Sequence, residues 1–282
     1  MNIGLVLAGG MAKGAYQVGA LRALSNYVPL NEIEYMSCAS IGVLNGYAYA
    51  TGNLDKAEQM WMNFCEDGEK LLINQVLRSN YLQESILNIC DPEKPIDPTF
   101  YCSLLDFGRR NIVYKDLSSV DMDQLPLYLK ASVAMPIFNR SVAIDDTSYF
   151  DGAMIDNIPV YPLIAHNLDY IICVYFDDTC YKFESTYFDN KVIKITFPCE
   201  SMLKQSLVFK RDGIVQMIED GYERTMQLLE PIFSEGYANL EHIYNAIEYA
   251  NKNTKNSLRI TGDVLTTNFN KITQKLTRKK VM

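Results

Sequence analysis

Histidine is scarce in this chain: its 282 residues include two, His166 and His242. His166 lies where the pattern predicts the end of a helix, a common position for a donor or a cation. His242 lies in an expected late helix, where a surface position is typical. A nucleophilic serine usually gives its proton to an imidazole. Any such serine in this chain is therefore expected to use another base.

Long apolar runs, paired cysteines and excess positive charge are also lacking. No apolar run reaches the roughly 18 residues that a membrane-spanning helix needs, and no basic leader precedes the first apolar segment. The net charge of −8 argues against a nucleic-acid partner. The cysteines have no paired spacing, which predicts reduced thiols in a cytoplasmic protein. They are Cys38, Cys65, Cys90, Cys102, Cys173, Cys180 and Cys199.

Nucleotide and metal sites are not indicated either. A phosphate-binding loop of the Walker type needs Gly-Lys followed by Ser or Thr, and the glycine-rich residues 9–14 lack this order. The acidic pairs Asp145-Asp146 and Asp177-Asp178 lack the spacing of metal ligands, and turns explain them. We expect no metal ion and no cofactor.

One serine has the position of a nucleophile. Residues 35–46 read YMSCASIGVLNG, an apolar strand that turns into a helix at Ser40. Such a sharp turn lifts the serine oxygen clear of the sheet, and the helix N-terminus adds unpaired N–H groups and a positive dipole end. Cys38 points to the other side of the strand by alternation, so a packing role is expected for its thiol.

Two further segments provide what such a serine would need. Residues 2–19 run from an apolar strand through glycines into a helix, and such a loop exposes backbone N–H groups to an anion. Asp151 comes directly after an expected hairpin, 142–144 with 148–150, and is followed by Gly152. An aspartate in this position can project from a tight loop toward a neighbouring site.

These segments resemble the patatin-like phospholipases, a family of serine lipid acyl hydrolases. The family's glycine-rich oxyanion loop matches residues 9–14 (GGMAKG), its Gly-x-Ser-x-Gly elbow matches 38–42 (CASIG), and its Asp-Gly-Ala motif matches 151–153. Three more segments resemble the family in the same order, namely 131–138 (ASVAMPIF), 155–160 (IDNIPV) and 221–225 (GYERT). The similarity therefore covers residues 1 to about 230.

The resemblance implies an acyl hydrolase of the phospholipase A, lysophospholipase or esterase type. Asp151 would accept the proton of Ser40 directly, Ser40 would attack an ester carbonyl, and water would hydrolyse the acyl-enzyme. The oxyanion hole would be formed by the N–H groups of Gly9, Gly10 and Met11. The residues expected to support these motifs are Lys13, Gly14, Gly42 and Gly152.

Two positions depart from the family pattern. Cys38 replaces the first glycine of the elbow, and because cysteine is small and apolar we expect the turn to survive. Met11 replaces the third glycine of the oxyanion loop, where a β-carbon resists positive φ at roughly 1–2 kcal/mol. Either the loop does not need that conformation, or the hole is strained. Two alternatives therefore stay open: a weak or inactive lipid-binding or regulatory protein on the same fold, and an acyltransferase.

The alternation of elements predicts an α/β fold, a three-layer sandwich with a largely parallel central sheet as in patatins. Residues 1–230 form the expected catalytic domain, within which 67–126 carry little strand signal and are interpreted as a helical insertion that covers the site as a lid. Residues 231–282 are expected to form a helix and a polar tail. Strands are expected at 3–7, 34–39, 142–144, 149–150, 170–175 and 191–196, and helices at 13–26, 40–51, 55–66, 72–89, 122–134, 159–167, 205–229 and 240–252.

A lipid or another acyl ester is the expected partner. Basic groups at Lys204, Lys210, Arg211 and 271–280 could rest on an anionic bilayer, so peripheral membrane contact is left open, although a solvated helix face is their commoner explanation. The oligomeric state, the lipid head group and the acyl-chain length are not specified by the sequence.

Overall fold

Strand β1 (Ile3–Leu7) forms the centre of the sheet, and all five of its residues are buried. An unbroken apolar run of this kind is typical of a parallel strand covered on both faces. β1 pairs in parallel with β2 (Ile33–Cys38) on one side and with β8 (Tyr170–Tyr175) on the other. The computed structural model describes residues 1–64, 71–78, 80–91, 94–136, 138–176, 181–183, 186–197, 208–252 and 256–258.

The main sheet has eight strands in the order β10-β8-β1-β2-β4-β7-β6, with β5 paired to β4 off this path. The strands from β10 to β4 run parallel, whereas β5, β6 and β7 add antiparallel pairs. The sheet is therefore largely parallel, as predicted. The remaining strands of this sheet are β4 (Thr99–Asp106), β5 (Asn111–Asp116), β6 (Val142–Ile144), β7 (Thr147–Asp151) and β10 (Val192–Thr196).

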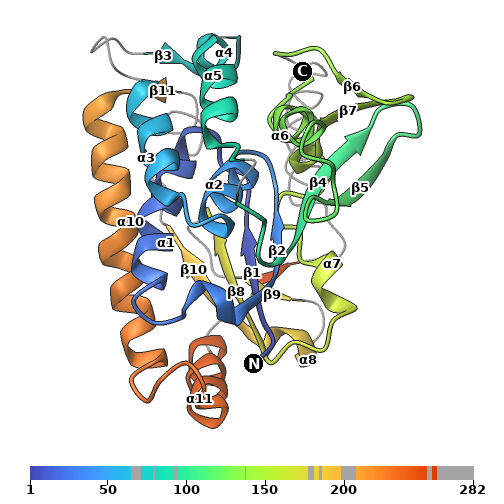
Figure 1. Cartoon of the computed structure of the whole chain (residues 1–282). Coiled ribbons are helices and arrows are strands. Elements are labelled where there is room, and N and C mark those ends of the chain that lie inside the picture. The colour runs from blue at the N-terminus through green and yellow to red at the C-terminus, as the bar shows by residue number, and fades with distance from the viewer. Residues whose placement is uncertain are drawn as a thin grey trace, which may run out of the picture.

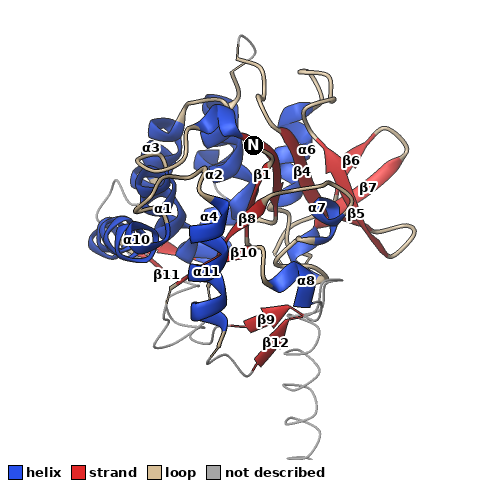
Figure 2. Cartoon of the chain, turned by 90° about the horizontal axis from the view of Figure 1, so that it is seen from below, coloured by secondary structure: helices blue, strands red, loops and turns tan. Residues whose placement is uncertain are grey.

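Helices cover both faces of the sheet and complete the three layers (Figures 1 and 2). Alternate residues of the strands face opposite sides: Leu5 and Leu7 pack toward α1, α2 and α10, whereas Val6 packs toward α7 and α8. The helices are α1 (Ala15–Leu24), α2 (Ile41–Ala50), α3 (Leu54–Asn63), α4 (Ile73–Arg78), α5 (Asn80–Ile89), α6 (Leu125–Ser132), α7 (Tyr161–Ile164), α8 (Thr186–Asp189), α10 (Arg211–Ile232) and α11 (Leu240–Asn251).

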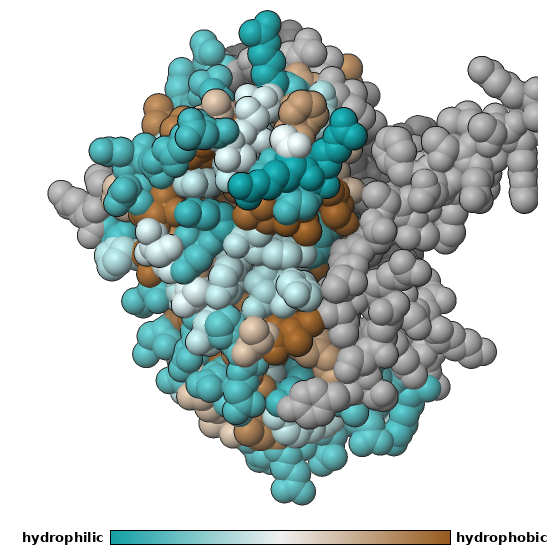
Figure 3. Space-filling view, turned by 90° about the vertical axis from the view of Figure 1, so that its right-hand side faces the viewer, coloured by the Kyte–Doolittle hydropathy of each residue, from teal (hydrophilic) through white to brown (hydrophobic). Residues whose placement is uncertain are grey.

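Short elements complete the described chain. Turns of 3-10 helix lie at Met11–Gly14, Leu30–Glu32 and Gly152–Met154. Two separate two-stranded sheets pair β3 (Leu71–Leu72) with β11 (Val208–Phe209), and β9 (Tyr181–Phe183) with β12 (Asn256–Leu258). On the face seen in Figure 3, apolar side chains form small groups separated by polar ones, as on an ordinary solvated surface.

The region 67–126 differs from its prediction. β4 and β5 both lie in it, and β4 lies inside the main sheet, next to β2. The expectation of little strand structure is therefore wrong for residues 99–106 and 111–116. The helix expected at 72–89 is instead the short strand β3 followed by α4 and α5. That these helices act as a lid stays a prediction.

The C-terminal elements agree with the expected helices in outline. α10 starts at Arg211 rather than at 205, because residues 208–209 form β11 with β3. Residues 205–207 lie outside the described residues, as do Cys65, Cys180, Cys199, Asp177, Asp178, Lys204 and the basic segment 271–280. α11 packs against α10. The boundary at residue 230 between the catalytic domain and the C-terminal segment stays a prediction.

Candidate active site

Ser40 lies at a sharp turn between β2 and α2. Its backbone has φ 52° and ψ −132°, a conformation that a residue with a β-carbon rarely adopts. The turn is fixed to the neighbouring strand, since the Ala39 N–H donates to Leu7 O at 3.0 Å. The Ser40 residue is 8% exposed. Strained backbone of this kind is held by its surroundings and is concentrated at functional sites.

Two glycines explain how the elbow fits beneath its helix. A β-carbon on Gly42 would lie 2.7 Å from Leu7 O, so the first turn of α2 needs glycine to pass the end of β1. A β-carbon on Gly46 would lie 2.7 Å from Cys38 Sγ. The Cys38 thiol is thus accommodated by the missing side chain one helical turn farther along α2. The predicted survival of the turn with Cys38 is confirmed.

Asp151 is brought to Ser40 by β4. Along β4, Cys102 pairs with Cys38 at the end of β2, and Leu104 pairs with Asp151 at the end of β7. β5 pairs with both of these segments of β4, so β2 and β7 must share the opposite edge. The two strands therefore meet end to end. Gly152 makes this approach possible, because its β-carbon would lie 2.6 Å from Leu104 N.

The Asp151 carboxyl is buried at 1% exposure and is hydrogen-bonded to the Ser40 hydroxyl. The Ala153 N–H donates to Asp151 Oδ1 at 2.9 Å. Burial raises the pKa of Asp151 to about 7, although the hydrogen bonds from Ser40 and Ala153 act in the opposite direction. The carboxyl is therefore a much stronger base than an ordinary aspartate and can exchange a proton near neutral pH.

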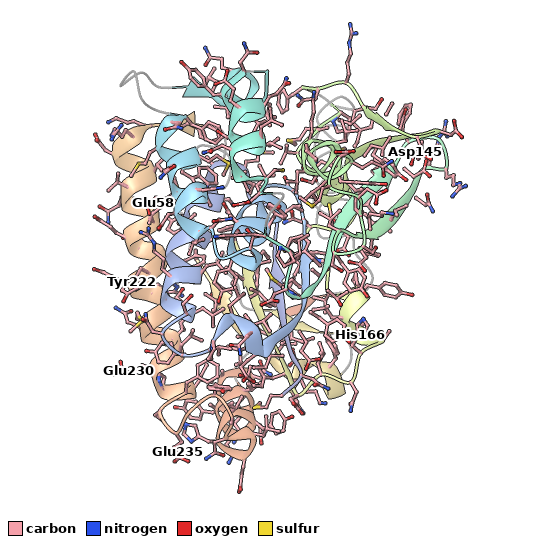
Figure 4. The ribbon with its side chains drawn as sticks, in the orientation of Figure 1. Glu58, Asp145, His166, Tyr222, Glu230 and Glu235 are labelled. Atoms are coloured by element: carbon pink, nitrogen blue, oxygen red, sulfur yellow. The ribbon has the colours of Figure 1, made fainter. Side chains whose placement is uncertain are left out.

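Neither histidine contacts this pair. The His166 ring stacks on Tyr35 with centroids 3.8 Å apart, and its Nε2 is 3.0 Å from Tyr101 Oη. Figure 4 places His166 beside α7, on the sheet face opposite α1 and α2. His242 lies on α11, and its Nε2 is 3.0 Å from Ser234 Oγ. Of these three side chains, only Asp151 is thus in contact with the Ser40 hydroxyl.

The glycine loop lies beside Ser40. Gly9 packs against the Ser40 Cβ and is clamped by Asn157: the Gly9 N–H donates to Asn157 O, and Asn157 Nδ2 donates to Gly9 O, both at 3.1 Å. This bond occupies the Gly9 N–H, which narrows the predicted oxyanion donors to Gly10 and Met11. Within the described residues, the Gly10 N–H has no backbone acceptor.

Met11 has the left-handed conformation that the family's glycine would favour, with φ 51°. The sequence left open whether the loop needs a positive φ at position 11 or avoids it. The structure has the positive φ, and the loop is therefore strained at Met11. A β-carbon in this region costs roughly 1–2 kcal/mol. Met11 also lines the cavity at Ser40.

Both ends of the glycine loop are held by a buried hydrogen-bond network that sequence reasoning missed. Gln17 Nε2 donates to Ala8 O at 2.7 Å, and Asn45 Nδ2 donates to Gly14 O at 2.9 Å. Asn45 Nδ2 also donates to Gln17 Oε1, and Trp61 Nε1 donates to Asn45 Oδ1. The signal in the sequence was a single amide in the otherwise apolar stretch 41–50. A satisfied buried network of this kind fixes the loop rigidly.

The remaining predicted residues have packing roles around the loop. Lys13 is 4% exposed, and its ammonium lies 5.4 Å from the centre of the Phe176 ring, a cation–π contact. Gly14 leaves room for Ile41 and Trp61, since its β-carbon would lie 2.7 Å from one and 2.8 Å from the other. Lys13 therefore places a positive charge next to the loop.

An apolar cavity of about 30 Å³ adjoins Ser40. It has room for only a few water molecules. Its walls come from the glycine loop, α2, α4, α5, β11 and the segment after α6, and they are lined by Met11, Ser40, Ile41, Phe64, Val76, Leu77, Leu82, Val133, Met135 and Phe209. In the part of the chain that the structure describes, no group of three or more potential metal ligands occurs.

Comparisons with known proteins concern the family and the fold of the chain. A model of the patatin-like phospholipase family matches residues 5–164, more than half of the chain. VipD from Legionella pneumophila has a similar structure, with a TM-score of 0.50 at 12% identity, over 88% of this chain and 74% of VipD. This likeness supports the fold alone. No significant match was found among curated proteins.

The type III effector ExoU gives a TM-score of 0.41 at 15% identity, over 80% of this chain and 52% of ExoU. In its heterodimeric complex with SpcU from Pseudomonas aeruginosa, ExoU gives 0.39 at 15% identity, over 82% of this chain and 51% of that chain. The chain thus spans about half the length of ExoU. None of the helices in the described ranges is both long and apolar enough to cross a membrane.

Proposed function

Because the chain belongs to the patatin-like phospholipase family, we propose that it is a serine hydrolase of lipid acyl esters and that Ser40 and Asp151 are its catalytic dyad. The observation that carries the proposal is the direct hydrogen bond from the Ser40 hydroxyl to a buried carboxyl whose pKa is raised to about 7. A base with a pKa near the working pH is the most effective proton acceptor for such a step.

The reaction would proceed in two halves. Asp151 takes the proton of Ser40 as the serine oxygen attacks the ester carbonyl, and the N–H groups of Gly10 and Met11 stabilise the resulting oxyanion. Collapse of the intermediate breaks the ester C–O bond, and Asp151 returns the proton to the leaving alcohol. Water then attacks the acyl-enzyme and gives a proton to Asp151. Asp151 returns this proton to the Ser40 oxygen as the fatty acid leaves, which regenerates both residues.

The apolar lining at Ser40 favours an acyl chain as the group transferred. The cavity of about 30 Å³ is far smaller than a fatty acyl chain. Val76 and Leu77 on α4 and Leu82 on α5 form part of its wall, so we expect these helices to move when a long chain binds. This supports the proposed lid. A cytoplasmic location and peripheral contact with membranes stay predictions.

The test compares Ser40→Ala and Asp151→Asn with the wild type on a mixed lipid extract and on a short uncharged ester. Each variant is expected to lose hydrolysis by about 1,000-fold or more, since the two residues act as a unit. Ser37→Ala is the matched control, because Ser37 Oγ is buried on the same strand without a hydrogen-bond partner among the described residues. It is expected to keep full activity.

The alternatives predict different outcomes. Labelling of wild-type Ser40 by a fluorophosphonate probe is expected for an enzyme, whereas lipid binding without labelling would support a regulatory protein instead. The strained φ of Met11 is the observation that favours a slow enzyme. An acyltransferase would be recognised by transfer of the acyl group to an added alcohol in preference to water. Full turnover by Ser40→Ala would contradict the dyad.

A further inference from the structure

The segment after Asp151 carries a second buried carboxyl group, that of Asp156, which is 2% exposed. The Tyr114 hydroxyl on β5 donates to Asp156 Oδ2 at 2.5 Å. Hydrogen bonds of this length between a hydroxyl and a carboxylate belong to the strong, charge-assisted class. Burial and the neighbouring Asp156 carboxylate raise the pKa of Tyr114, so its hydroxyl keeps its proton and stays a donor. The catalytic steps proposed above use neither side chain.

Asp156 ends a tight turn that begins at the proposed base. The Asp156 N–H donates to Gly152 O at 2.9 Å. Within the same turn, the Ala153 N–H donates to Asp151 Oδ1 at 2.9 Å. The turn is therefore one compact unit that includes the base, and the bond from Tyr114 ties that unit to β5.

The residue after the turn, Asn157, clamps the glycine loop. The Gly9 N–H donates to Asn157 O, and Asn157 Nδ2 donates to Gly9 O, both at 3.1 Å. The position of Asn157 therefore helps to set how the loop lies beside Ser40. Because Asn157 directly follows Asp156 in the chain, the bond from Tyr114 holds the clamp as well as the turn.

The sheet places Tyr114 within reach of this turn. Tyr114 pairs with Ser103 of β4, and a β-carbon on Gly152 would lie 2.5 Å from the Ser103 carbonyl carbon. The turn thus packs directly on the residue of β4 that pairs with Tyr114. The Tyr114 ring also packs against Tyr161 of α7, with centroids 5.8 Å apart, and Figures 1 and 2 both show β5 beside α7. These contacts fix the direction of the hydroxyl.

We propose that Tyr114 is a positioning residue of the active site. Through Asp156 it holds the clamp at Asn157, and with it the oxyanion loop, in the place that catalysis needs. The inference rests on the proposed function and adds to it a residue that touches no substrate. It predicts that the loss of one hydroxyl group outside the site slows the chemical step and leaves substrate binding unchanged.

The kinetic test compares Tyr114→Phe with the wild type on a short uncharged ester. Phenylalanine keeps the ring but lacks the donor. Because small displacements near reacting groups are costly, kcat is expected to fall about tenfold while KM changes by less than about twofold. The inflection of kcat/KM with pH should stay where the pKa of Asp151, about 7, places it. A lower rate at an unchanged inflection indicates displaced oxyanion donors rather than an altered base.

Tyr170→Phe is the matched control. The Tyr170 hydroxyl donates to Tyr237 O at 3.1 Å. Tyr170 pairs with Ile3 at the start of β1, whereas Ser40 follows the strand that pairs with the end of β1. Loss of this bond should lower the thermal unfolding midpoint, as the loss at Tyr114 also should, but leave kcat unchanged. If the bond of Tyr114 mattered only for stability, the two variants would have the same kcat, and the proposal would be overturned.

A double-mutant cycle with Asn157→Ala tests the route of the effect. If Tyr114 acts through Asn157, Tyr114→Phe should slow the wild type about tenfold but slow the Asn157→Ala protein by less than about twofold. Equal losses of kcat in the two backgrounds would show that the hydroxyl does not act through the clamp, and would overturn the proposal.

Amide hydrogen exchange separates this inference from the catalytic proposal, because it needs no turnover. Exchange of the Gly9 N–H, which is bonded to Asn157 O, should become about tenfold faster in Tyr114→Phe and stay unchanged in Tyr170→Phe. Unchanged exchange in Tyr114→Phe would overturn the positioning role even in an active enzyme. Faster exchange in a chain without esterase activity would contradict the dyad and leave the hold of Tyr114 on the loop supported.

Discussion

Gly9 faces Ser40 so closely that a β-carbon on Gly9 would lie 2.9 Å from the Ser40 Cβ. The same carbon would lie 2.5 Å from Asn157 Oδ1, the side chain that clamps the loop. The approach of the glycine loop to the serine therefore depends on the absence of a side chain at position 9.

Gly9→Ala is expected to push the loop away from Ser40. A displacement of this kind should reduce kcat/KM by about 100-fold, because small misplacements near reacting groups are costly. The strain should also lower the free energy of unfolding by about 1–3 kcal/mol. Ester hydrolysis and thermal unfolding measure the two effects.

Gly213→Ala is the matched control. Gly213 lies in α10, and nothing lies within 4 Å of its added β-carbon. Alanine there should stabilise the protein by about 0.5–1 kcal/mol and leave turnover unchanged. If both variants behave alike, the contact between the loop and Ser40 has no special importance.

The pH dependence of activity should report the ionisation of Asp151. Its pKa is raised to about 7, and only the ionised form accepts the proton of Ser40. The value of kcat/KM is therefore expected to fall about tenfold for each pH unit below 7 and to level off above it. Rates measured between about pH 3 and pH 9 test this, and an inflection near the ordinary aspartate pKa of about 4 would refute it.

The same shift has a consequence for stability. Because the folded-state pKa of Asp151 lies above the ordinary value of 3.8, the folded protein favours the protonated carboxyl. The stabilising contribution is complete below about pH 4 and is lost as the pH rises through about 7. Asp151→Asn, which stays neutral, should gain stability relative to the wild type between these pH values. Urea unfolding at both ends of the range measures the difference.

Met11→Gly is expected to relieve the strain of the oxyanion loop. Glycine adopts φ 51° without the penalty of a β-carbon, so its loop should be more stable by about 0.5–1 kcal/mol after the greater freedom of the unfolded chain is included. An increase of a few-fold in kcat is expected with it.

Met11→Ala separates the two effects of this change. Alanine removes the side chain from the cavity but keeps the β-carbon, so it should not show the gain in stability. Chemical denaturation and kinetics of the two variants should therefore diverge. Equal behaviour would show that the Met11 side chain, rather than its φ, limits the site.

Much of the fold could be predicted because each central strand is recognisable from its own short stretch of sequence. β1 and β8 are short apolar runs buried on both faces, and each begins and ends at the expected residue. β4 was missed because its residues alternate between packing layers and include Tyr101 and the buried Ser103. Its identity as a strand depends on pairing with β2, β5 and β7, which no local pattern contains.

In the candidate site, too, features carried by short motifs could be predicted, whereas features that depend on distant residues could not. Ser40, Asp151 and the glycine loop belong to short motifs, and the structure brings them together, while their catalytic roles stay predictions. The network of Gln17 and Asn45 was not foreseen, because each amide finds its partner on another element. The bond that occupies the Gly9 N–H likewise depends on Asn157, far along the chain.

The shared edge of β4 also sets the order in which the site can form during folding. Ser40 and Asp151 meet only when β2 and β7 have both paired with β4, and these pairings join distant parts of the chain. Long-range strand pairing is slow, because the entropy of closing the intervening loops is lost first. Ser40 therefore lacks its proposed base in a partly folded chain, and hydrolytic activity should appear only once both pairings with β4 have formed.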